Sequence, residues 1–483
     1  MDAEAYLTDG FGVRLSIEAK PSGWVRFGEV ARAAAPPRIK QVLVSPGHGV
    51  PYLNTSQVFD PRPTPRKWLA MEKTTKAADR LVKEGTILVM ASATVGRAIV
   101  ATRMHEGAIV SHHFMRVTPF REELAGWVYA FLRSAQALSM MSGTQYASVI
   151  RHIEPHHLAG LPMPLVSESV AEAFQKKVRD IVSCRNNAAR LRALAEAAFE
   201  KAAGAAPTPK TEEGYTIRVS AALSGRRRLE AAYHAPQVRE IIANFKRWEP
   251  LGNITQRIWW PTRFKRQFVE SGTPYMSADD IFTTNPYALK SVLVEGKKDS
   301  GEFLVEPNWI VMARSGQTYG LNGSATLTTD YHSGFFLSDD LIRIAPDPAK
   351  ARPGFLLVAL THPTLGRPIV IREAYGMSIP HLDPEDVAAI PVVRLGKEVE
   401  DAIADLAEQS VAEQARAEVL ERELAEEASA VVSEFLMQSD THPMSDDADD
   451  VEIARARIAE VDEHPDRVLR GENLAARMAQ WES

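Results

Sequence analysis

The stretch YASVIRHIEPHHLAGLPMPLV, residues 146–166, decides the organisation of this 483-residue chain, because a second copy follows 229 residues later. The copy is YGMSIPHLDPEDVAAIPVVRL, residues 375–395, and six of the 21 positions are identical. His152 matches His381, and Pro155 matches Pro384. A sequence repeat at one spacing indicates two units with the same local structure. The chain is therefore predicted to contain two similar halves.

Shorter matches follow the same order along the chain, with offsets that drift only from 222 to 229. They pair Gly49–Tyr52 with Gly272–Tyr275, Val89–Ala91 with Val311–Ala313, and Ser111–Val117 with Ser338–Ile344. Several weak matches in one order at one spacing support a single duplication, which covers most of both halves.

Each half shows the same succession of elements. Short apolar runs bounded by Gly, Pro and Ser, such as Ile87–Met90 and Trp309–Met312, predict strands. Helical stretches are expected next, at Trp127–Leu132 and Phe355–Leu360. The fold class predicted is α+β, with two tandem β-rich domains that are each followed by a long helix.

The two long helices are predicted from apolar residues at helical spacing, over Ser167–Ala203 and Glu398–Met437, with Ser167 as an N-cap. At 1.5 Å per residue each helix spans roughly 55–60 Å. A helix of that length with one apolar stripe needs a partner helix, and the two are expected to pair as an antiparallel coiled coil. The predicted organisation is a first domain at 1–166, a helix at 167–204, a linker at 205–214, a second domain at 215–395, a helix at 396–437 and an acidic helical tail at 438–483.

The composition is that of a globular protein, with 45% hydrophobic and 24% charged residues. No run of 18 apolar residues is present, so no membrane span is expected. The acidic first residues lack the apolar segment of a signal peptide. A single cysteine, Cys184, excludes an intramolecular disulfide and a CxxC zinc site. We therefore expect a cytoplasmic protein.

The net charge of −6 hides an uneven distribution. Residues 1–166 carry 19 Lys and Arg against 13 Asp and Glu, whereas residues 396–483 carry 8 against 24. A basic body permits contacts with nucleic-acid phosphates, and the acidic end is expected to face away from DNA or to meet a protein partner.

Several motifs in this frame resemble the specificity subunit of type I restriction–modification systems, over roughly residues 15–437. The resemblance rests on VMASATVG at 89–96, VMARSGQTYG at 311–320, the pattern S-x-x-φ-φ-R-φ (φ, apolar) at 111 and 338, the Gly143-Thr144-Gln145 turn, LAGLPMP at 158–164 and RLEAAYHAP at 228–236. The second half departs from the pattern, because it lacks the Gly-x-Gln turn and has Val393 where the first half has Pro164.

The resemblance implies a non-catalytic protein that recognises double-stranded DNA. Each domain is expected to recognise one part of an asymmetric bipartite site, and the paired helices to set the gap between the parts. Methyltransferase subunits, two per chain, and a restriction and translocase subunit are the implied partners, in a system of anti-phage defence. S-adenosylmethionine, Mg²⁺ and ATP are expected in those subunits, with no cofactor or metal in this chain.

Candidate DNA-binding residues follow from basic and polar side chains interleaved with aromatic ones, which suit contacts to phosphates and base edges. In the first half they are Arg38, Lys40, Tyr52, Arg62, Arg66, Lys67, Ser92 and Thr94. In the second half they are Arg257, Arg263, Lys265, Arg266, Tyr275, Arg314, Ser315, Gln317, Thr318 and Tyr319. The alternatives are a solvated surface for the basic clusters and an ordinary hairpin turn for the loop at 314–320.

Two other functions stay open on the sequence. Asp279 and Asp280 upstream of Glu295-Gly-Lys297 follow the layout of a Mg²⁺-dependent nuclease, which would make the protein a self-sufficient enzyme. A scaffold that uses the paired helices only for assembly is the third possibility. The histidines around 112 and 152 raise the question of a metal site, but adjacent pairs without helical spacing argue against one.

Overall fold

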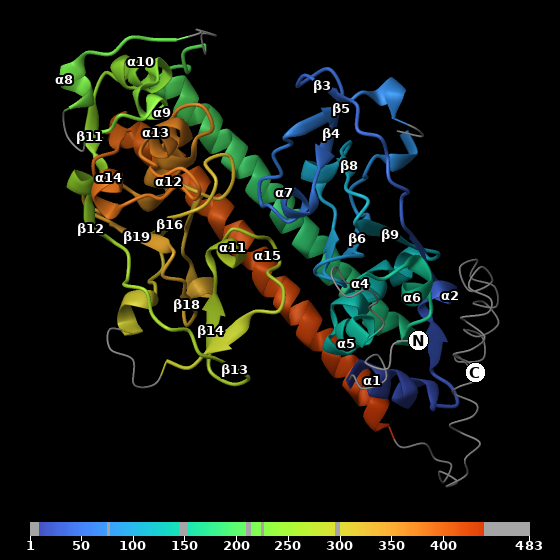
Figure 1. The fold of residues 1–483 in the computed structure, drawn as a ribbon. Helices are drawn as coiled ribbons and strands as arrows, with labels where there is room; N and C mark the ends of the chain where they lie inside the picture. The colour runs from blue at the N-terminus through green and yellow to red at the C-terminus, as the bar shows by residue number, and fades with distance from the viewer. Residues whose placement is uncertain are drawn as a thin grey trace. The chain divides into compact units, whose positions relative to one another are not determined.

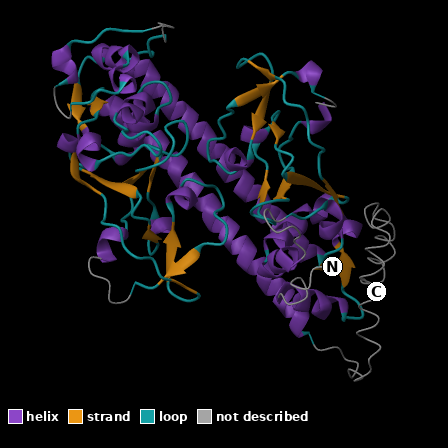
Figure 2. Ribbon diagram, in the orientation of Figure 1, coloured by secondary structure: helices purple, strands orange, loops and turns teal. Residues whose placement is uncertain are grey.

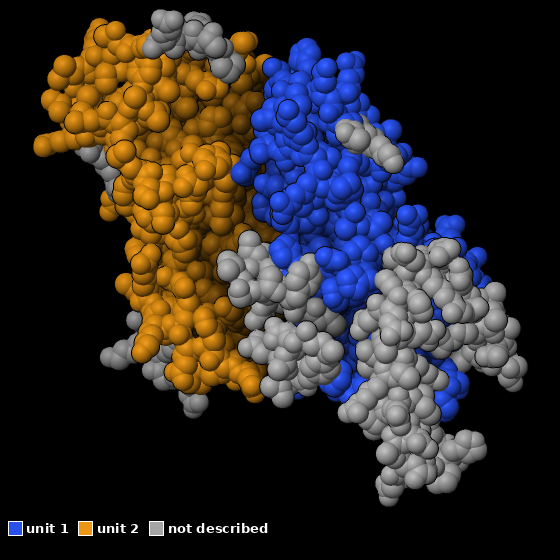
Figure 3. All heavy atoms as spheres, turned by 45° about the vertical axis from the view of Figure 1, so that its right-hand side comes forward, with its two compact units in different colours: residues 1–186, 416–483 blue, residues 187–415 orange. Residues whose placement is uncertain are grey.

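The computed structural model describes residues 9–74, 78–143, 152–208, 214–223, 227–294 and 300–438. They form a mixed α+β fold of short strands, short helices and two long helices (Figures 1 and 2), as predicted. The chain divides into two compact units, coloured separately in Figure 3. Unit 1 comprises residues 1–186 and 416–483, and unit 2 comprises residues 187–415.

The sheets of unit 1 are three small ones within its described residues, with strand orders β1-β10, β2-β9-β6-β7 and β3-β5-β4-β8. The strands are β1 (Trp24–Arg26), β2 (Ala31–Ala34), β3 (Leu43–Val44), β4 (Val50–Leu53), β5 (Lys67–Leu69), β6 (Ile87–Met90), β7 (Ala98–Val100), β8 (Ile109–Val110), β9 (Phe114–Pro119) and β10 (Pro162–Pro164). Most neighbours are antiparallel, but β4 and β8 pair in parallel.

Unit 2 repeats this topology strand for strand, with orders β11-β20, β12-β19-β16-β17 and β13-β15-β14-β18. Its strands are β11 (Trp248–Pro250), β12 (Thr255–Trp259), β13 (Phe268–Val269), β14 (Thr273–Met276), β15 (Lys290–Val292), β16 (Ile310–Ala313), β17 (Ala325–Leu327), β18 (Phe336–Leu337), β19 (Leu341–Pro346) and β20 (Pro391–Val393). The parallel pair recurs as β14 and β18. The duplication seen in the sequence is therefore also a duplication of the fold.

Several short helices occupy matching places in the two units, but the sets differ, with six in unit 1 and seven in unit 2 among the described residues. Unit 1 has α1 (Asp9–Glu18), α2 (Phe27–Val30), α3 (Thr55–Val58), α4 (Ala125–Arg133), α5 (Ala135–Gly143) and α6 (Pro155–Ala159). Unit 2 has α8 (Val219–Ala222), α9 (Ala231–His234), α10 (Pro236–Asn244), α11 (Ala278–Ile281), α12 (Pro353–Thr361), α13 (Gly366–Arg372) and α14 (Pro384–Ala388). The predicted stretches Trp127–Leu132 and Phe355–Leu360 lie within α4 and α12, which confirms both helices.

The two long helices are α7 (Glu168–Ala203) and α15 (Lys397–Met437), within one residue of the predicted starts. The Ser167 hydroxyl accepts a hydrogen bond from the Val170 N–H at 3.4 Å, so Ser167 caps α7. The boundary between the units falls inside both helices, so each unit contains one part of each.

The helix parts run antiparallel within each unit. In unit 1, Lys177 pairs with Glu427 at 2.6 Å and Arg185 pairs with Glu421 at 3.0 Å, so the residue numbers rise along α7 as they fall along α15. In unit 2, the Ser410 hydroxyl donates to the Ala188 carbonyl at 2.7 Å. The predicted antiparallel pairing is confirmed inside each unit.

Each unit has its own large core, formed where a short helix packs on the long ones. In unit 1, Trp127 of α4 is buried against Phe174 of α7, with ring centroids 5.2 Å apart. The Trp127 indole N–H also donates to the Pro164 carbonyl at 2.9 Å, which joins α4 to β10. In unit 2, Phe355 of α12 packs on Phe199 with centroids 6.1 Å apart.

One glycine in each unit permits this close docking. A Cβ on Gly126 of α4 would lie 2.3 Å from the backbone of Gln175 in α7. A Cβ on Gly354 of α12 would lie 2.6 Å from the Ala404 carbonyl oxygen in α15. Both distances are too short for any side chain, so the helices are in backbone contact at equivalent places.

Some predicted features lie outside the described residues. They are residues 209–213 of the linker, Thr144 and Gln145 of the predicted turn together with the adjacent Tyr146, and the acidic tail from residue 439. Within the described part of the chain, no single helix has the length and apolar composition to cross a membrane; the bent pair α12 and α13 has them together.

Candidate nucleic-acid interface

A polar loop follows an inner strand of a four-stranded sheet at the same point in both units, after β6 in unit 1 and after β16 in unit 2. In unit 1 it joins β6 to β7 and holds Ser92 and Thr94, and in unit 2 it joins β16 to β17. Ser92 forms a β-bridge with His152, and Ser315 forms the equivalent bridge with His381. The histidines matched in the sequence therefore share a structural position, beside the loops predicted to contact DNA.

The unit 2 loop, residues 314–322, is held in place by hydrogen bonds that the Arg367 and Gln317 side chains donate to backbone carbonyls. The Arg367 guanidinium donates to the carbonyls of Thr318 at 3.3 Å, Gly320 at 2.8 Å and Asn322 at 3.1 Å. The Gln317 amide donates to the Ser378 carbonyl at 3.1 Å. Arg367 was not among the predicted residues, and it fixes the loop that presents them.

The predicted residues of this loop differ in what they offer to a ligand. Tyr319 is 70% exposed, so its ring is open to an external partner. Arg314 stacks on the Trp260 ring at 4.3 Å and lies 3.4 Å from the Asp383 carboxylate. The Ser315 hydroxyl donates to Asp340. Arg314 and Ser315 are therefore engaged by unit 2 itself.

The basic residues of unit 1 gather on the sheet β3-β5-β4-β8. Arg38 and Lys40 are exposed on the segment that leads into β3. Lys67 opens β5 opposite Tyr52 of β4, and its ammonium donates to the Gln41 side chain at 3.3 Å. Tyr52 is buried, so its ring forms a wall here and is not an exposed stacking surface. Arg62 and Arg66 lie on the loop between α3 and β5.

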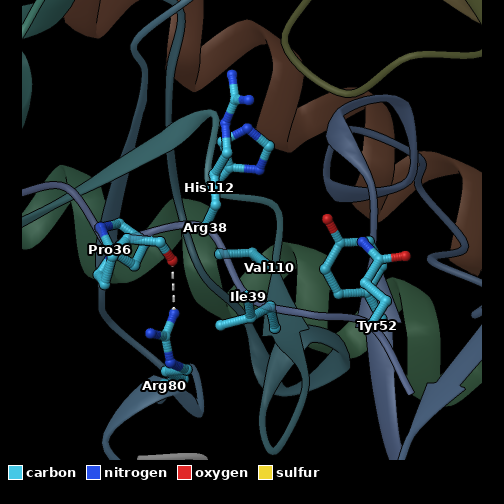
Figure 4. Close-up of a pocket in the computed structure, with 9 residues that line it drawn as sticks. Pro36, Arg38, Ile39, Tyr52, Arg80, Val110 and His112 are labelled. Atoms are coloured by element: carbon cyan, nitrogen blue, oxygen red, sulfur yellow. Dashed lines mark hydrogen bonds between the residues drawn. The ribbon is translucent and has the colours of Figure 1, made fainter. Parts of the chain in front are cut away.

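A pocket of about 140 Å³ opens beside this segment (Figure 4). Arg80 donates to the Pro37 carbonyl at 3.0 Å and so holds the segment against the sheet. The lining residues are Pro36, Pro37, Arg38, Ile39, Gln41, Tyr52, Arg80, Val110 and His112. Arg38 and His112 lie together in the close-up, with Ile39 and Val110 beneath them.

The corresponding segment of unit 2 has the same pattern, which residue-level sequence comparison had missed. PPRIKQVLV at 36–44 and PTRFKRQFV at 261–269 each place an arginine five residues before the first strand of the sheet. Arg263 is thus the equivalent of Arg38, and Lys265 is the equivalent of Lys40. The shared Pro-x-Arg-x-Lys spacing was the signal that could have found this pairing.

The cations of unit 2 have carboxylate partners. Arg263 lies 3.8 Å from Asp339, and Arg266 also pairs with Asp339, which is buried. Arg257 pairs with Glu302 at 3.0 Å and lies over the Trp259 ring at 4.3 Å. Tyr275 of β14 is buried like Tyr52. The positive charge predicted to contact DNA is therefore partly neutralised within unit 2.

Unit 1 has histidines where unit 2 has these aspartates. His112 and His113 stand at the places of Asp339 and Asp340, each pair following an equivalent serine, Ser111 or Ser338. Burial lowers the pKa of His112 first, and the positive charges of His113, Arg38 and His152 lower it further. His113 is hydrogen-bonded to Ser92, as Asp340 is to Ser315.

The motif arginines have a structural role. Arg116 of β9 donates to the carbonyls of Asp79 at 3.1 Å and Leu81 at 3.3 Å. Its equivalent Arg343 of β19 is fully buried, and it donates to the carbonyls of Ser338 at 2.9 Å and Leu337 at 3.1 Å. Burial lowers the pKa of Arg343 to about 10. These arginines hold loops to the sheet.

Two further features of the sequence concern a metal site and the nuclease-like pattern of Asp279, Asp280, Glu295 and Lys297. Among the described residues, no three His, Cys, Asp or Glu side chains are placed to hold one metal ion. The Asp280 carboxylate accepts from the Ser277 N–H at 2.9 Å and so completes the capping box at the start of α11, where Ser277 is the N-cap. Glu295 and Lys297 of the nuclease-like pattern lie outside the described residues.

Comparison with known proteins gave matches among solved structures only. No family model and no curated protein matches the chain. The chain is similar to the S subunit of a type I restriction–modification system from M. genitalium, with 12% identity, coverage of 87% of this chain and 98% of that chain, and a TM-score of 0.36. It is also similar to the HsdS subunit from Thermoanaerobacter tengcongensis, with 16% identity, 86% and 96% coverage, and a TM-score of 0.24. A third similar chain comes from a structure concerned with complex assembly and conformational transition of the type I R-M system, with 16% identity, 86% and 98% coverage, and a TM-score of 0.26.

Proposed function

We propose that this chain is a DNA-specificity subunit of a type I restriction–modification system, which recognises an asymmetric bipartite site without a catalytic reaction of its own. The observation that carries the proposal is the strand-for-strand repeat of one β-rich module, with different side chains on equivalent loops. Two modules of one fold suit two contacts along one duplex. Because the loops differ, the two parts of the DNA site should differ.

The basic and aromatic residues at the loops support DNA as the ligand. Arg38 and Lys40 in unit 1 and Tyr319 in unit 2 are exposed beside them. Lysine and arginine contacts to phosphates supply affinity, whereas loop side chains at base edges supply specificity. In this proposal the protein acts in the cytoplasm, and methyltransferase and restriction subunits that bind it supply S-adenosylmethionine, Mg²⁺ and ATP chemistry.

The first experiment is single-molecule sequencing of genomic methylation in cells with and without this gene, with the methyltransferase gene left intact. Loss of methylation at one gapped, asymmetric motif upon deletion supports the proposal and identifies the target. Unchanged methylation contradicts it and favours a self-sufficient nuclease or a scaffold. Mg²⁺-dependent cleavage by the purified chain, lost in Glu295→Gln, would identify the nuclease.

A second experiment assigns the loops to the parts of the site. Gln317→Ala combined with Tyr319→Ala should relax one part of the methylated motif and leave the other unchanged, because both residues lie on a unit 2 loop. Thr94→Ala should affect the opposite part, since Thr94 lies on the equivalent unit 1 loop. Lys83→Ala, at an exposed cation of unit 1 that belongs to neither loop, is the matched control. Equal effects of both loop variants on both parts would contradict the assignment.

A further inference from the structure

We propose that the pocket rimmed by Arg38 and His112 in unit 1 is a phosphate-binding subsite that takes up a proton with its ligand, and that unit 2 has no equivalent subsite. The phosphate can belong to a DNA backbone or to a smaller phosphate compound. The DNA source rests on the proposed function, whereas binding of inorganic phosphate does not.

The first support is the charge at the rim. Among the described residues, no carboxylate pairs with Arg38 or His112. The charged and titratable groups around the pocket are Arg38 before β3, Tyr52 of β4, Arg80, and the histidines at 112, 113 and 152. All those that carry charge near neutral pH are cationic. A buried anion would therefore meet only favourable charge.

The second support is the fixed place of the His112 ring in the pocket lining. The His112 ring lies 4.1 Å from the His113 ring, and His113 is hydrogen-bonded to Ser92. His112 Nε2 is shielded from solvent and has no hydrogen-bond partner in the described part of the chain, so no protein group there neutralises the ring. The ring is thus held in place before any ligand arrives.

The third support is the way unit 2 fills the same position. Asp339 stands where His112 stands, and it pairs with Arg263 and Arg266. Phe264, the equivalent of Ile39, packs on Phe303 at 4.7 Å and on Phe336 at 5.1 Å between centroids. In unit 2 the Asp339 carboxylate thus supplies the negative charge that a bound phosphate would supply in unit 1. The aromatic rings around Phe264 occupy the place of the smaller apolar side chains that line the unit 1 pocket.

Proton uptake follows from the same geometry. Burial and the neighbouring cations lower the pKa of His112 and His113, so both rings favour the neutral form in the empty pocket. A bound phosphate would offset these effects and raise the pKa of the rings. The liganded pocket then binds more protons than the empty one. Affinity should therefore rise as pH falls, by up to about tenfold per pH unit for each proton taken up.

The test measures binding to the full chain by isothermal titration calorimetry at about pH 5.5 and about pH 8, on either side of the ordinary histidine pKa. Inorganic phosphate is the ligand, and sulfate is measured beside it, because phosphate itself gains a proton over this range while the charge of sulfate stays constant; the pH dependence is therefore taken from sulfate. The wild-type chain should bind more tightly at the lower pH. Arg38→Ala should weaken binding at both values. His112→Gln should remove most of the pH dependence, and His112→Asp should abolish binding by copying unit 2. Lys83→Ala should match the wild type, and circular dichroism checks that each variant is folded.

The same variants then bind a DNA duplex that carries the methylated motif. Loss of phosphate binding and of pH-dependent DNA binding together in Arg38→Ala supports a backbone phosphate as the ligand. Loss of phosphate binding with unchanged DNA binding supports a smaller phosphate compound, while the methylation experiment separately judges the proposed function. The proposal is overturned if wild-type phosphate binding is absent, or if it is equal in Arg38→Ala, His112→Asp and wild type.

Discussion

Ser111-His112-His113 in unit 1 and Ser338-Asp339-Asp340 in unit 2 occupy the same turn, yet they produce opposite charge arrangements. In unit 1 the turn adds histidines beside Arg38, and in unit 2 it adds two carboxylates, of which Asp339 pairs with Arg263 and Arg266. The backbone around both turns has the same strand pairings. The hydrogen-bonded frame therefore persisted after the duplication, while the side chains at the loops diverged.

The docking of the long helices shows a second difference of this kind. In unit 1, Glu421 of α15 is buried, accepts a hydrogen bond from the Tyr129 hydroxyl at 2.8 Å and forms an ion pair with Arg185 of α7 at 3.0 Å. In unit 2, Arg352 pairs with Asp405 at 2.6 Å and with Glu408, at a partly exposed site. Unit 1 therefore depends on a buried ionic cluster, and unit 2 on a solvated one.

The largest effect should come from breaking the buried cluster. Glu421→Ala removes the carboxylate that Arg185 and Arg133 share, so that Arg185 keeps only Glu418, 3.6 Å away. Loss of one partner of a buried pair costs about 3–5 kcal/mol. The free energy of unfolding, measured by urea titration, should fall by that amount. Asp405→Ala in unit 2 is the matched control and should cost about 1 kcal/mol or less, because the pair is exposed. Equal losses in the two variants would remove the distinction between the units.

The next effect concerns two equivalent buried histidines, His105 in unit 1 and His332 in unit 2, and tests whether burial makes the stability of both units depend on pH. His332 accepts from the Thr329 N–H at 3.0 Å, as His105 does from the Thr102 N–H at 3.1 Å. Burial lowers the pKa of His332 to about 4, and it also lowers the pKa of His105. The unfolded chain then binds more protons than the folded one between about pH 6.5 and about pH 4.

Stability from His332 should accordingly be complete above about pH 6.5 and be lost as pH falls toward about pH 4, by roughly 3 kcal/mol. Urea titrations across this range should show the loss. His332→Gln should flatten the dependence, and so should His105→Gln to a smaller extent. A steep profile in His332→Gln that matches the wild type would contradict the assignment.

A smaller effect is expected at Gly126 and Gly354, the two glycines that let a short helix contact the backbone of a long helix in the same way in both units. Gly126→Ala and Gly354→Ala should each lower the free energy of unfolding by about 1–3 kcal/mol, because the added Cβ overlaps the facing helix. Gly12→Ala on α1 has open space at its Cβ and should be neutral or stabilising. Thermal unfolding measures all three. If only one docking glycine mattered, the long helices would be docked differently in the two units.

The smallest effect distinguishes the two recognition loops. Ala93 in the unit 1 loop has φ of 65°, a conformation that favours glycine, and unit 2 has Gly316 with φ of 128° at this point. Ala93→Gly should therefore stabilise the chain by about 0.5–1 kcal/mol, and Gly316→Ala should destabilise it by about 1 kcal/mol. Differential scanning calorimetry would detect both shifts. A loss of stability in Ala93→Gly would show that the loop relies on alanine.

Much of the fold was predictable because it depends on local patterns. The strand β6 and helices α4 and α12 follow apolar runs, and α7 and α15 follow helical periodicity within one residue of their predicted starts. The interface was less predictable, because a basic residue in the sequence does not reveal its partner. Arg314 and Arg257 looked like free cations, but their carboxylate partners, Asp383 and Glu302, lie far along the chain.

The duplication, the order of elements in each half and the two long helices could all be predicted from the chain, because identities at one spacing and 3.6-residue periodicity are properties of the sequence. Which charges are exposed depends instead on folding. His112 and Asp339 occupy the same sequence position in the repeat, but their effect depends on Arg38, Arg263 and Arg266, which folding brings to them from other segments. Electrostatic interactions depend on distance and burial, and both are set by packing.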